Sequence, residues 1–548
     1  MIEKSVKLLA NTRSRVAVGL EEIMDDMVPH TPYGADKKKK FRPFRAGSEA
    51  QLRACYDNMD VLRAFTSAGR SAADSLMENL CCIKEMSGTL ERTANNVLSV
   101  VELFEVKAFL LRTKKISEII GAGMPVVPDC YQLTDTTKLL DILDPGGERL
   151  DTFYIYDAFS PALGEMRKEK RQLELDMRKA QKAVRSRLEQ EHGFRMTPKF
   201  ELMVPKADKD GLSLAESLPE LVRTDEDYMS VVFTLKMNDE MYAVQARSEE
   251  LNSRIEEEEF RVCERLTRDI GRYKDVLQHN CDVIGNIDWD LSKVLYAQAH
   301  GCIRPEIADE HVIEIEDGRN LVVEASVKRR GGSYCPVSVT LADGVCAITG
   351  ANMGGKTVSI KMIGQTALLA QYGMYVPAKK ARIGLSNFMQ VLIGDSQNVQ
   401  RGLSSFGSEM EELREILDNA ADRSVIIIDE IASGTNPSEG LALTKSFIKY
   451  FADKPYITLI TTHFDHAAVG ENVHNLQVKG LSGVDFEKLS RELTYAKRKE
   501  RIEIIGKYMD YHLVPITEGA AAPRDALNIA KILGVYDEII DAAKNFLV

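Results

Sequence analysis

Residues 348–360, "ITGANMGGKTVSI", constrain the fold most, because they set glycines, a lysine and a threonine directly after an apolar run. The preceding residues 345–349, "VCAIT", predict a short buried strand. The following segment, "VSIKMIGQTALLAQYG", has the apolar spacing of a helix. A strand, a glycine-rich loop and a helix in this order are the context of a phosphate-binding loop. The sequence therefore predicts an α/β domain that holds a nucleotide.

The loop fits the pattern GxxxxGK[ST] with residues Gly350, Ala351, Asn352, Met353, Gly354, Gly355, Lys356 and Thr357. Its glycines allow backbone N–H groups to turn toward phosphates, and the helix N-terminus adds partial positive charge. We expect Lys356 to neutralise the β- and γ-phosphate oxygens of ATP, and Thr357 to ligate Mg²⁺. The alternative is a chance match in a glycine-rich turn, against which the flanking strand and helix argue.

Two further strands end in residues that suit phosphate chemistry. In "SVIIIDEIASGTNP", residues 424–437, four apolar residues run into Asp429 and Glu430. A buried strand that ends in two acids is costly unless a cation sits there. We expect Asp429 to hold Mg²⁺ through water, and Glu430 to be the base that polarises the attacking water. The strand "ITLITTH" ends at His463, which could reach the γ-phosphate or that water; a helix-cap or core histidine is the alternative.

The composition fits a soluble, cytoplasmic protein. The chain has 548 residues, 28% of them charged and 44% apolar, enough for two to four domains. No run of 18 uncharged apolar residues occurs, so we expect no membrane-spanning helix, and the N-terminus lacks the apolar core of a secretory signal. The nine cysteines show no CxxC spacing, which indicates reduced thiols.

Helical patterns dominate the first half of the chain. Two segments, Leu173 to Leu188 and Leu251 to Leu277, each carry one narrow apolar stripe and an otherwise charged surface, which is typical of a two-stranded antiparallel coiled coil. Between them, "FELMVPK" and "YMSVVFTLKMNDEMYAV" predict strands. The expected organisation is a multidomain chain with a helical domain (1–159), a first helical arm (160–194), a small β tip (195–248), a second arm (249–300) and an α/β P-loop domain (301–548). The family resemblance described below implies that these are a core or lever domain, the arms and tip of a clamp, and an ABC-type ATPase and dimerisation domain.

The charge of the expected clamp bears on its partner. The net charge of the chain is −12. Residues 165–191 carry nine basic and six acidic side chains, residues 249–275 carry six and nine, and the tip, 195–247, carries seven and ten. A clamp that grips DNA should be basic, because phosphate neutralisation supplies most non-specific affinity. The basic run "DKKKKFRPFR", residues 36–45, could bind phosphates or stack a base, or could be a solvated loop.

Four motifs in order resemble the ATPase domain of the MutS family. They are the loop "GANMGGKT", the segment "GMYVPA" at Gly373–Ala378, "SSFGSEM" from Ser404 to Met410, and "DEIASGTNPSEG", residues 429–440. The resemblance covers roughly residues 300–548. It implies an ABC-type ATPase that dimerises head to tail, as a homodimer or with a related subunit. It also implies that Ser404 and Ser405 contact the γ-phosphate held by the partner, and that Asn352 contacts the nucleotide phosphates or the catalytic water of its own site.

The resemblance also sets two functions against each other. Helical arms tipped by a sheet are similar to the MutS clamp, but we find no mismatch-reading domain with a Phe-x-Glu motif. The chain therefore resembles the short, stand-alone MutS-like ATPases, one of which serves the reactivase of lysine 5,6-aminomutase. We expect an ATPase that remodels a protein partner, a cobalamin-dependent aminomutase; the alternative is a mismatch-repair or recombination protein that binds mismatched or branched DNA. A ribosome-binding ATPase is a weaker third idea.

Overall fold

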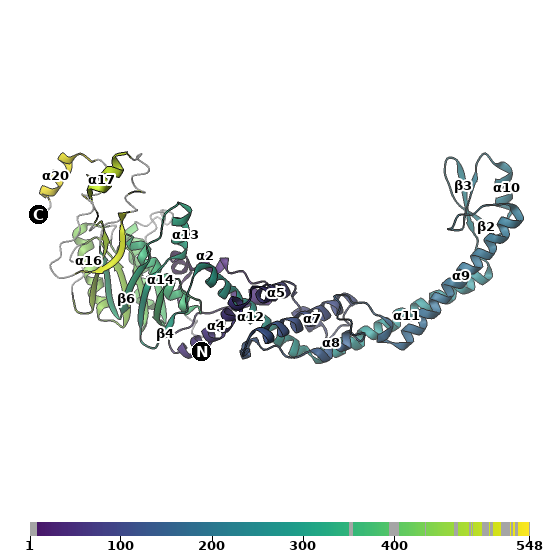
Figure 1. Ribbon diagram of the computed structural model, residues 1–548, viewed down its shortest axis with the longest axis horizontal. Helices are drawn as coiled ribbons and strands as arrows, with labels where there is room; N and C mark the ends of the chain where they lie inside the picture. Colours follow the sequence, from purple (N-terminus) through teal and green to yellow (C-terminus); the bar gives the residue numbers. More distant parts are fainter. Residues whose placement is uncertain are drawn as a thin grey trace. The chain divides into compact units, whose positions relative to one another are not determined.

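The computed structural model describes residues 8–349, 355–393, 405–432, 435–464, 470–481, 484, 486–495, 504, 508–516, 527, 530–531 and 535–546. The chain divides into two units (Figure 1). The first unit comprises residues 1–81, 119–132 and 283–548, and the second comprises residues 82–118 and 133–282. Helical regions and mixed sheets therefore make up a multidomain protein.

A six-stranded sheet organises the first unit. Its strand order is β13-β12-β7-β11-β10-β9, and all neighbouring pairs are parallel except β12 with β13. The strands are β7 Gly344–Thr349, β9 Phe388–Leu392, β10 Ser424–Ile428, β11 Tyr456–Thr461, β12 Val473–Gly480 and β13 Asp510–Pro515. The strands predicted before the glycine loop and before Asp429 are confirmed as β7 and β10.

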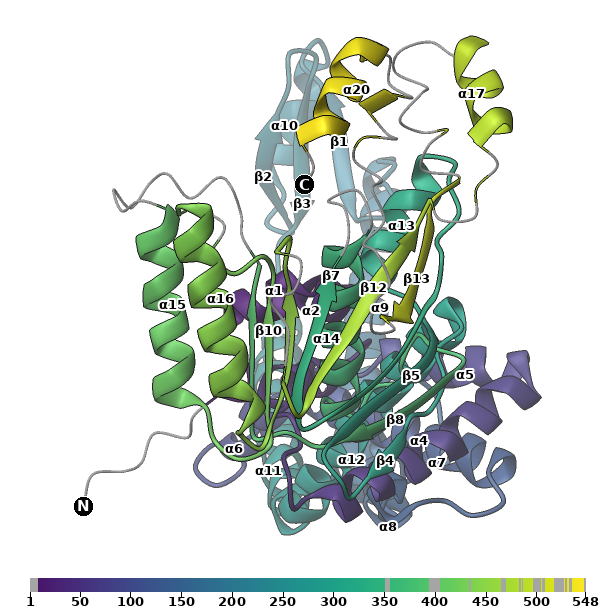
Figure 2. The same ribbon diagram turned by 90° about the vertical axis from the view of Figure 1, so that its left-hand side faces the viewer.

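Helices cover both faces of this sheet, which explains its apolar strands. Every residue of β10 is buried, as expected for a strand packed on two sides. On one face, Ile426 and Ile428 form a core with Leu413 of α15 (Ser405–Asn419) and Phe451 of α16 (Pro437–Ala452). Figure 2 shows α15 and α16 side by side on that face. On the other face lies α14 (Lys356–Gln371), the helix predicted after the glycine loop, where Ile427 of β10 approaches Gly364.

A second, four-stranded sheet and further helices complete the first unit. The sheet has the order β4-β8-β5-β6, with β4 Glu306–Ala308, β5 Val312–Gly318, β6 Val337–Ala342 and β8 Lys380–Gly384. The helices are α1 Thr12–Ala17, α2 Leu20–Asp26, α3 Pro32–Lys40, α4 Glu49–Ala68, α5 Arg70–Cys81, η1 Asp129–Tyr131, α13 Leu321–Arg329, α17 Phe486–Tyr495 and α20 Asp537–Phe546. Helices α7 (Val100–Gly123) and α12 (Lys274–His300) contribute residues to both units.

Two long helices lie together in the second unit, α9 (Pro161–His192) and α11 (Asp239–Arg272). They are joined by the ion pairs Arg167–Glu259 and Arg247–Glu169, with nitrogen–oxygen distances of 2.6 and 3.1 Å. Between them in sequence lies a three-stranded sheet of order β1-β3-β2 (Figure 1). The remaining elements are α6 Ser87–Arg92, α8 Thr137–Leu143, η2 Asp157–Phe159, β1 Glu201–Pro205, α10 Lys209–Ser217, β2 Leu221–Glu226 and β3 Ser230–Leu235.

The strand predicted over "YMSVVFTLKMNDEMYAV" is correct only for its first part. It ends at Leu235, and α11 begins at Asp239. The side chain of Asn238 accepts a hydrogen bond from the backbone N–H of Met241, and Asp239 and Glu240 follow in the first turn. This N-cap starts the helix within a segment whose apolar residues also suit a strand. No described helix is long and apolar enough to cross a membrane.

Candidate active site

The carboxyl ends of three neighbouring strands form the candidate site. Strand β7 pairs with β11, and β11 pairs with β10, all in parallel. Loops that follow parallel strands emerge at the same edge of the sheet, where α/β proteins bind ligands. The residues predicted from sequence follow these strands: Lys356 after β7, Asp429 and Glu430 after β10, and His463 after β11. The fold thus brings four of the predicted side chains to one edge.

Lys356 is the first residue of α14 and is only 3% exposed. The preceding Gly355 has φ +79°, in the left-handed region that favours glycine, and a Cβ there would lie 2.6 Å from Cδ1 of Tyr511. Burial lowers the pKa of the Lys356 amine, while Glu430 and Asp429 oppose that shift. A buried amine at a helix N-terminus is placed to meet an anion.

Asp429 accepts two hydroxyl hydrogen bonds. Thr357 Oγ1 donates to one carboxylate oxygen at 2.7 Å, and Thr461 Oγ1 donates to the other at 2.5 Å. Thr461 also accepts from the backbone N–H of Glu430 at 2.9 Å. Thr461 was not among the residues predicted from sequence; its signal is a hydroxyl at the last position of an apolar strand. This threonine fixes both the carboxylate and the turn after β10.

His463 links the acid to the lysine. Its Nε2 lies 2.8 Å from Oε1 of Glu430, and its Nδ1 lies 3.1 Å from Nζ of Lys356. A protonated lysine can only donate, so Nδ1 accepts and Nε2 carries the proton that is donated to Glu430. The imidazole therefore bridges the Lys356 amine and the Glu430 carboxylate. His463 thus lies beside two other predicted site residues, and its role at the γ-phosphate or the attacking water stays a prediction.

The turn after β10 has an unusual backbone. Glu430 and Ala432 both have φ +58°, which is uncommon for residues with a Cβ and concentrates at functional sites. Glu409 of α15 accepts a hydrogen bond from the backbone N–H of Ala432 at 2.6 Å, and burial raises the pKa of this carboxyl group. Glu409 was noted only as part of a motif, and its position gives it a role in holding this turn.

Several predicted site residues lie outside the described residues. These are Gly350, Ala351, Asn352, Met353, Gly354 and Ser404. Ser405 is the first residue of α15, and its side chain is likewise outside the described part. Their roles at the nucleotide and at the partner subunit stay predictions.

The oxygen donors at this edge fit a magnesium ion. Mg²⁺ in nucleotide sites is bound by one or two protein oxygens together with phosphate oxygens and water. The Thr357 hydroxyl and the Asp429 carboxylate supply such oxygens and lie next to each other. The amine of Lys356 lies on the same edge. The arrangement can bind a magnesium–nucleotide complex and present a carboxylate to water.

At alkaline pH the protein should take up protons when it binds a nucleotide. Burial lowers the pKa of Lys356 from 10.5. A phosphate beside Nζ favours the charged amine and raises that pKa, so Lys356 gains a proton between the two values. Calorimetric titration with a non-hydrolysable ATP analogue at a series of alkaline pH values below 10.5, in two buffers of different ionisation enthalpy at each, measures this uptake. Lys356→Arg is the control, since arginine does not titrate there. Heats independent of the buffer in both proteins would contradict the prediction.

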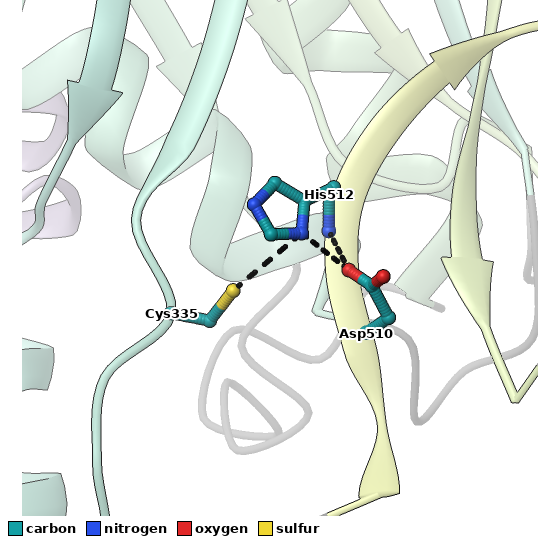
Figure 3. A group of neighbouring side chains, drawn as sticks. All are labelled: Cys335, Asp510 and His512. Carbon is teal, nitrogen blue, oxygen red and sulfur yellow. Dashed lines mark hydrogen bonds and ion pairs between the residues drawn. The ribbon is translucent and has the colours of Figure 1, made fainter. Parts of the chain in front are cut away.

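A second group of side chains, Cys335, Asp510 and His512, lies elsewhere in the first unit (Figure 3). His512 Nδ1 contacts Asp510 Oδ1 and lies 3.9 Å from the Cys335 sulfur. Asp510 also pairs with Lys479 at 2.7 Å, and the pKa of its carboxyl is lowered to about 2; burial opposes this shift, which Lys479 and His512 produce. The Asp510 carboxylate is therefore satisfied by the Lys479 amine and the His512 ring, and these contacts account for the group.

Comparison with known proteins finds matches over the second half of the chain and, more weakly, beyond it. Residues 346–548 match the model of MutS domain V. The DNA mismatch repair protein MutS of Salinibacter ruber is 26% identical over 556 residues, covering 96% of this chain and 56% of that protein. MutS of Aquifex pyrophilus is 30% identical over 54% of this chain and 32% of that protein. Endonuclease MutS2 of Acetivibrio thermocellus is 29% identical over 54% of this chain and 35% of that protein. The chain thus spans about half of these relatives, or less.

Proposed function

From these matches, which support membership of the chain in the MutS family, we propose that the protein is a MutS-type ATPase that couples ATP binding and hydrolysis to action on DNA. Proteins of this family are ATPases, and the relatives above are named for DNA mismatch repair and for endonuclease activity. The observation that carries the ATPase assignment is the contact network of Lys356, His463 and Glu430 beside the Thr357–Asp429 pair.

In this proposal, each residue of the network has a defined role in ATP hydrolysis. Lys356 binds the β- and γ-phosphate oxygens, where a desolvated cation is worth more than it is in water. Glu430 accepts a proton from the attacking water, and His463 holds the carboxylate in the orientation this requires. Thr461 fixes the turn that carries Glu430. Mg²⁺ held near Thr357 and Asp429 would neutralise charge on the phosphate oxygens.

The active form in this proposal is a dimer, either of two copies or with a related subunit. Ser404 and Ser405 would then contact the γ-phosphate in the partner's site, and Asn352 would contact phosphate or water in its own. The resemblance of "SSFGSEM" to the family motif supports this part. Helix α15, which begins at Ser405, also carries Glu409, so the same helix holds the turn after β10.

A basic stripe on α9 supports DNA as the partner. Exposed cations share one face of this helix at helical spacing, namely Lys168, Arg171, Arg178, Lys179 and Lys182. The stripe is roughly 21 Å long at ~1.5 Å per residue. Lys179 pairs with Asp176 at 3.1 Å, whereas the other four have no ion pair in the described part of the second unit. Acids of α9, including Glu165 and Glu169, lie on the neighbouring face. The basic and acidic side chains of α9 named here therefore lie on different faces of the helix.

Removing charge from this stripe should reduce the salt dependence of duplex binding. The variant Arg171→Gln/Arg178→Gln/Lys182→Gln loses three phosphate contacts, so the slope of log affinity against log salt should shrink by about 2.7. Fluorescence anisotropy of a labelled duplex over a salt series, with a non-hydrolysable ATP analogue present, measures the slope. The control Arg254→Gln/Arg261→Gln/Arg268→Gln removes the same charge from α11 and should leave the slope nearly unchanged. Equal slopes for all three proteins would refute the role of the stripe.

A protein partner is the second candidate function. The tip, residues 195–247, carries ten acids against seven bases, which disfavours contact with phosphates. A chain whose tip meets a protein, such as a cobalamin-dependent aminomutase, would not bind a duplex tightly in low salt. Absence of duplex binding in the experiment above would therefore favour this candidate, although the matched relatives carry no such name.

A further inference from the structure

A cavity in the first unit lies apart from the residues of the candidate active site. Its volume is about 560 Å³, within the range of roughly 300–1,000 Å³ typical of small-molecule sites. It is bounded by the end of α3, by α4, by α12 within the first unit, and by Cys130 of η1. The basic run at residues 36–45, whose role the sequence left open, forms one wall. None of Lys356, Thr357, Asp429, Glu430 and His463 lines it.

The charge of the cavity wall is predominantly positive. Lys37, Lys40, Arg42 and Lys293 line it, against the single acid Asp290. Asp290 is already engaged, because it accepts from Tyr131 Oη at 2.8 Å and pairs with Nζ of Lys293 at 2.7 Å. Burial opposes the charge of Lys293, but Asp290 prevails and raises the pKa of the amine, so Lys293 stays protonated.

The aromatic side of the cavity holds an unused hydrogen-bond donor. Trp289, the one tryptophan of the chain, is 3% exposed. Its indole Nε1–H is buried and meets no acceptor among the described residues. A buried donor without an acceptor destabilises the fold. Phe41 lies edge-on to Trp289, with ring centroids 5.9 Å apart, and Lys293 lies 5.1 Å from the Phe41 centroid.

We propose that this cavity binds a phosphate monoester with a planar base, of the nucleoside monophosphate class, at a site separate from the ATP site. The cations of Lys37 and Arg42 match the phosphate, whereas Lys40 is already paired with Asp36 at 2.7 Å. Side-chain amides of Gln51 and Asn58 in the wall match the polar edge of a base. The aromatic wall supplies the apolar contact that such planar rings make. Because none of these residues belongs to the ATPase network, the inference does not depend on the proposed function.

Trp289 itself reports on the ligand, since no other tryptophan contributes to the emission. The experiment titrates the full chain with AMP and follows tryptophan fluorescence, in the wild type and in Lys356→Ala, which lacks the phosphate-loop amine. A saturable change of equal affinity in both proteins is expected. Loss of the change in Lys356→Ala would show that the signal comes from the ATP site and would overturn the proposal, as would the absence of a saturable change up to millimolar AMP.

Two variants test the wall without disturbing its buried ion pair. Lys37→Gln/Arg42→Gln should weaken AMP binding by about tenfold or more, through loss of charge-assisted contacts. Lys39→Gln/Arg45→Gln removes the same charge from the same segment, outside the wall, and should bind AMP as the wild type does. If both double variants bound AMP equally weakly, the binding would be non-specific electrostatic attraction, and the proposal would be wrong. Adenosine and inorganic phosphate should each bind at least about tenfold more weakly than AMP; phosphate binding as tight as AMP would overturn the nucleotide part.

Discussion

Replacing Glu430 with glutamine is expected to lower ATP turnover by about 10²–10⁴-fold while ATP binding changes by only a small factor. Glutamine has nearly the same shape and still offers an oxygen to the Nε2–H of His463, which lies 2.8 Å from Oε1 in the native protein. The amide cannot accept the proton of the attacking water. The expected loss therefore lies in the chemical step and leaves the groups that hold the phosphates intact.

Two further variants make this result specific. Glu415→Gln changes an exposed acid of α15 and should leave turnover unchanged. Lys356→Ala removes the buried amine and should weaken binding itself. Equilibrium binding of ATP and single-turnover phosphate release separate the two effects. The assignment of Glu430 as the base would be wrong if Glu430→Gln lost binding as severely as Lys356→Ala, or if it kept full turnover.

The part of the site that sequence could predict is the part encoded locally. A glycine loop before Lys356 and an apolar strand before Asp429 specify both the element and the chemistry within a dozen residues or so. Strand β7, strand β10 and helix α14 occur where the pattern places them. Short-range sequence determines these elements because strand burial and loop geometry act on neighbouring residues.

The residues that sequence reasoning missed act through the fold. Thr461 reaches Asp429 only because β10 and β11 pair in parallel, and Glu409 reaches Ala432 only because α15 packs on the sheet. The spacing of a single threonine or a helix glutamate in the sequence does not predict such a contact. Trp289 and the run at 36–45 likewise meet across more than two hundred residues of chain.

The net charge of each segment did not predict how the charged side chains are distributed over the second unit. Residues 165–191 carry a small excess of bases, yet the five exposed cations of the stripe share one face of α9. A helix separates charges by angle, so a sum over a segment hides a stripe that a phosphate backbone could meet. The boundary of α11 was missed for a related reason, because the cap at Asn238 competes with apolar residues that also suit a strand.

Phosphate release tests most directly whether the edge formed by β7, β10 and β11 is a magnesium-dependent ATPase site. Phosphate release from ATP by the purified chain should require Mg²⁺, cease in EDTA, and fall by about tenfold or more in Asp429→Asn, because the carboxylate beside Thr357 helps hold the ion. Thr461→Val should fall less, since it orients Asp429 and the turn of Glu430 without contacting the ion. Phosphate release that is equal with Mg²⁺ and with EDTA, or that is unchanged in Asp429→Asn, would contradict the account.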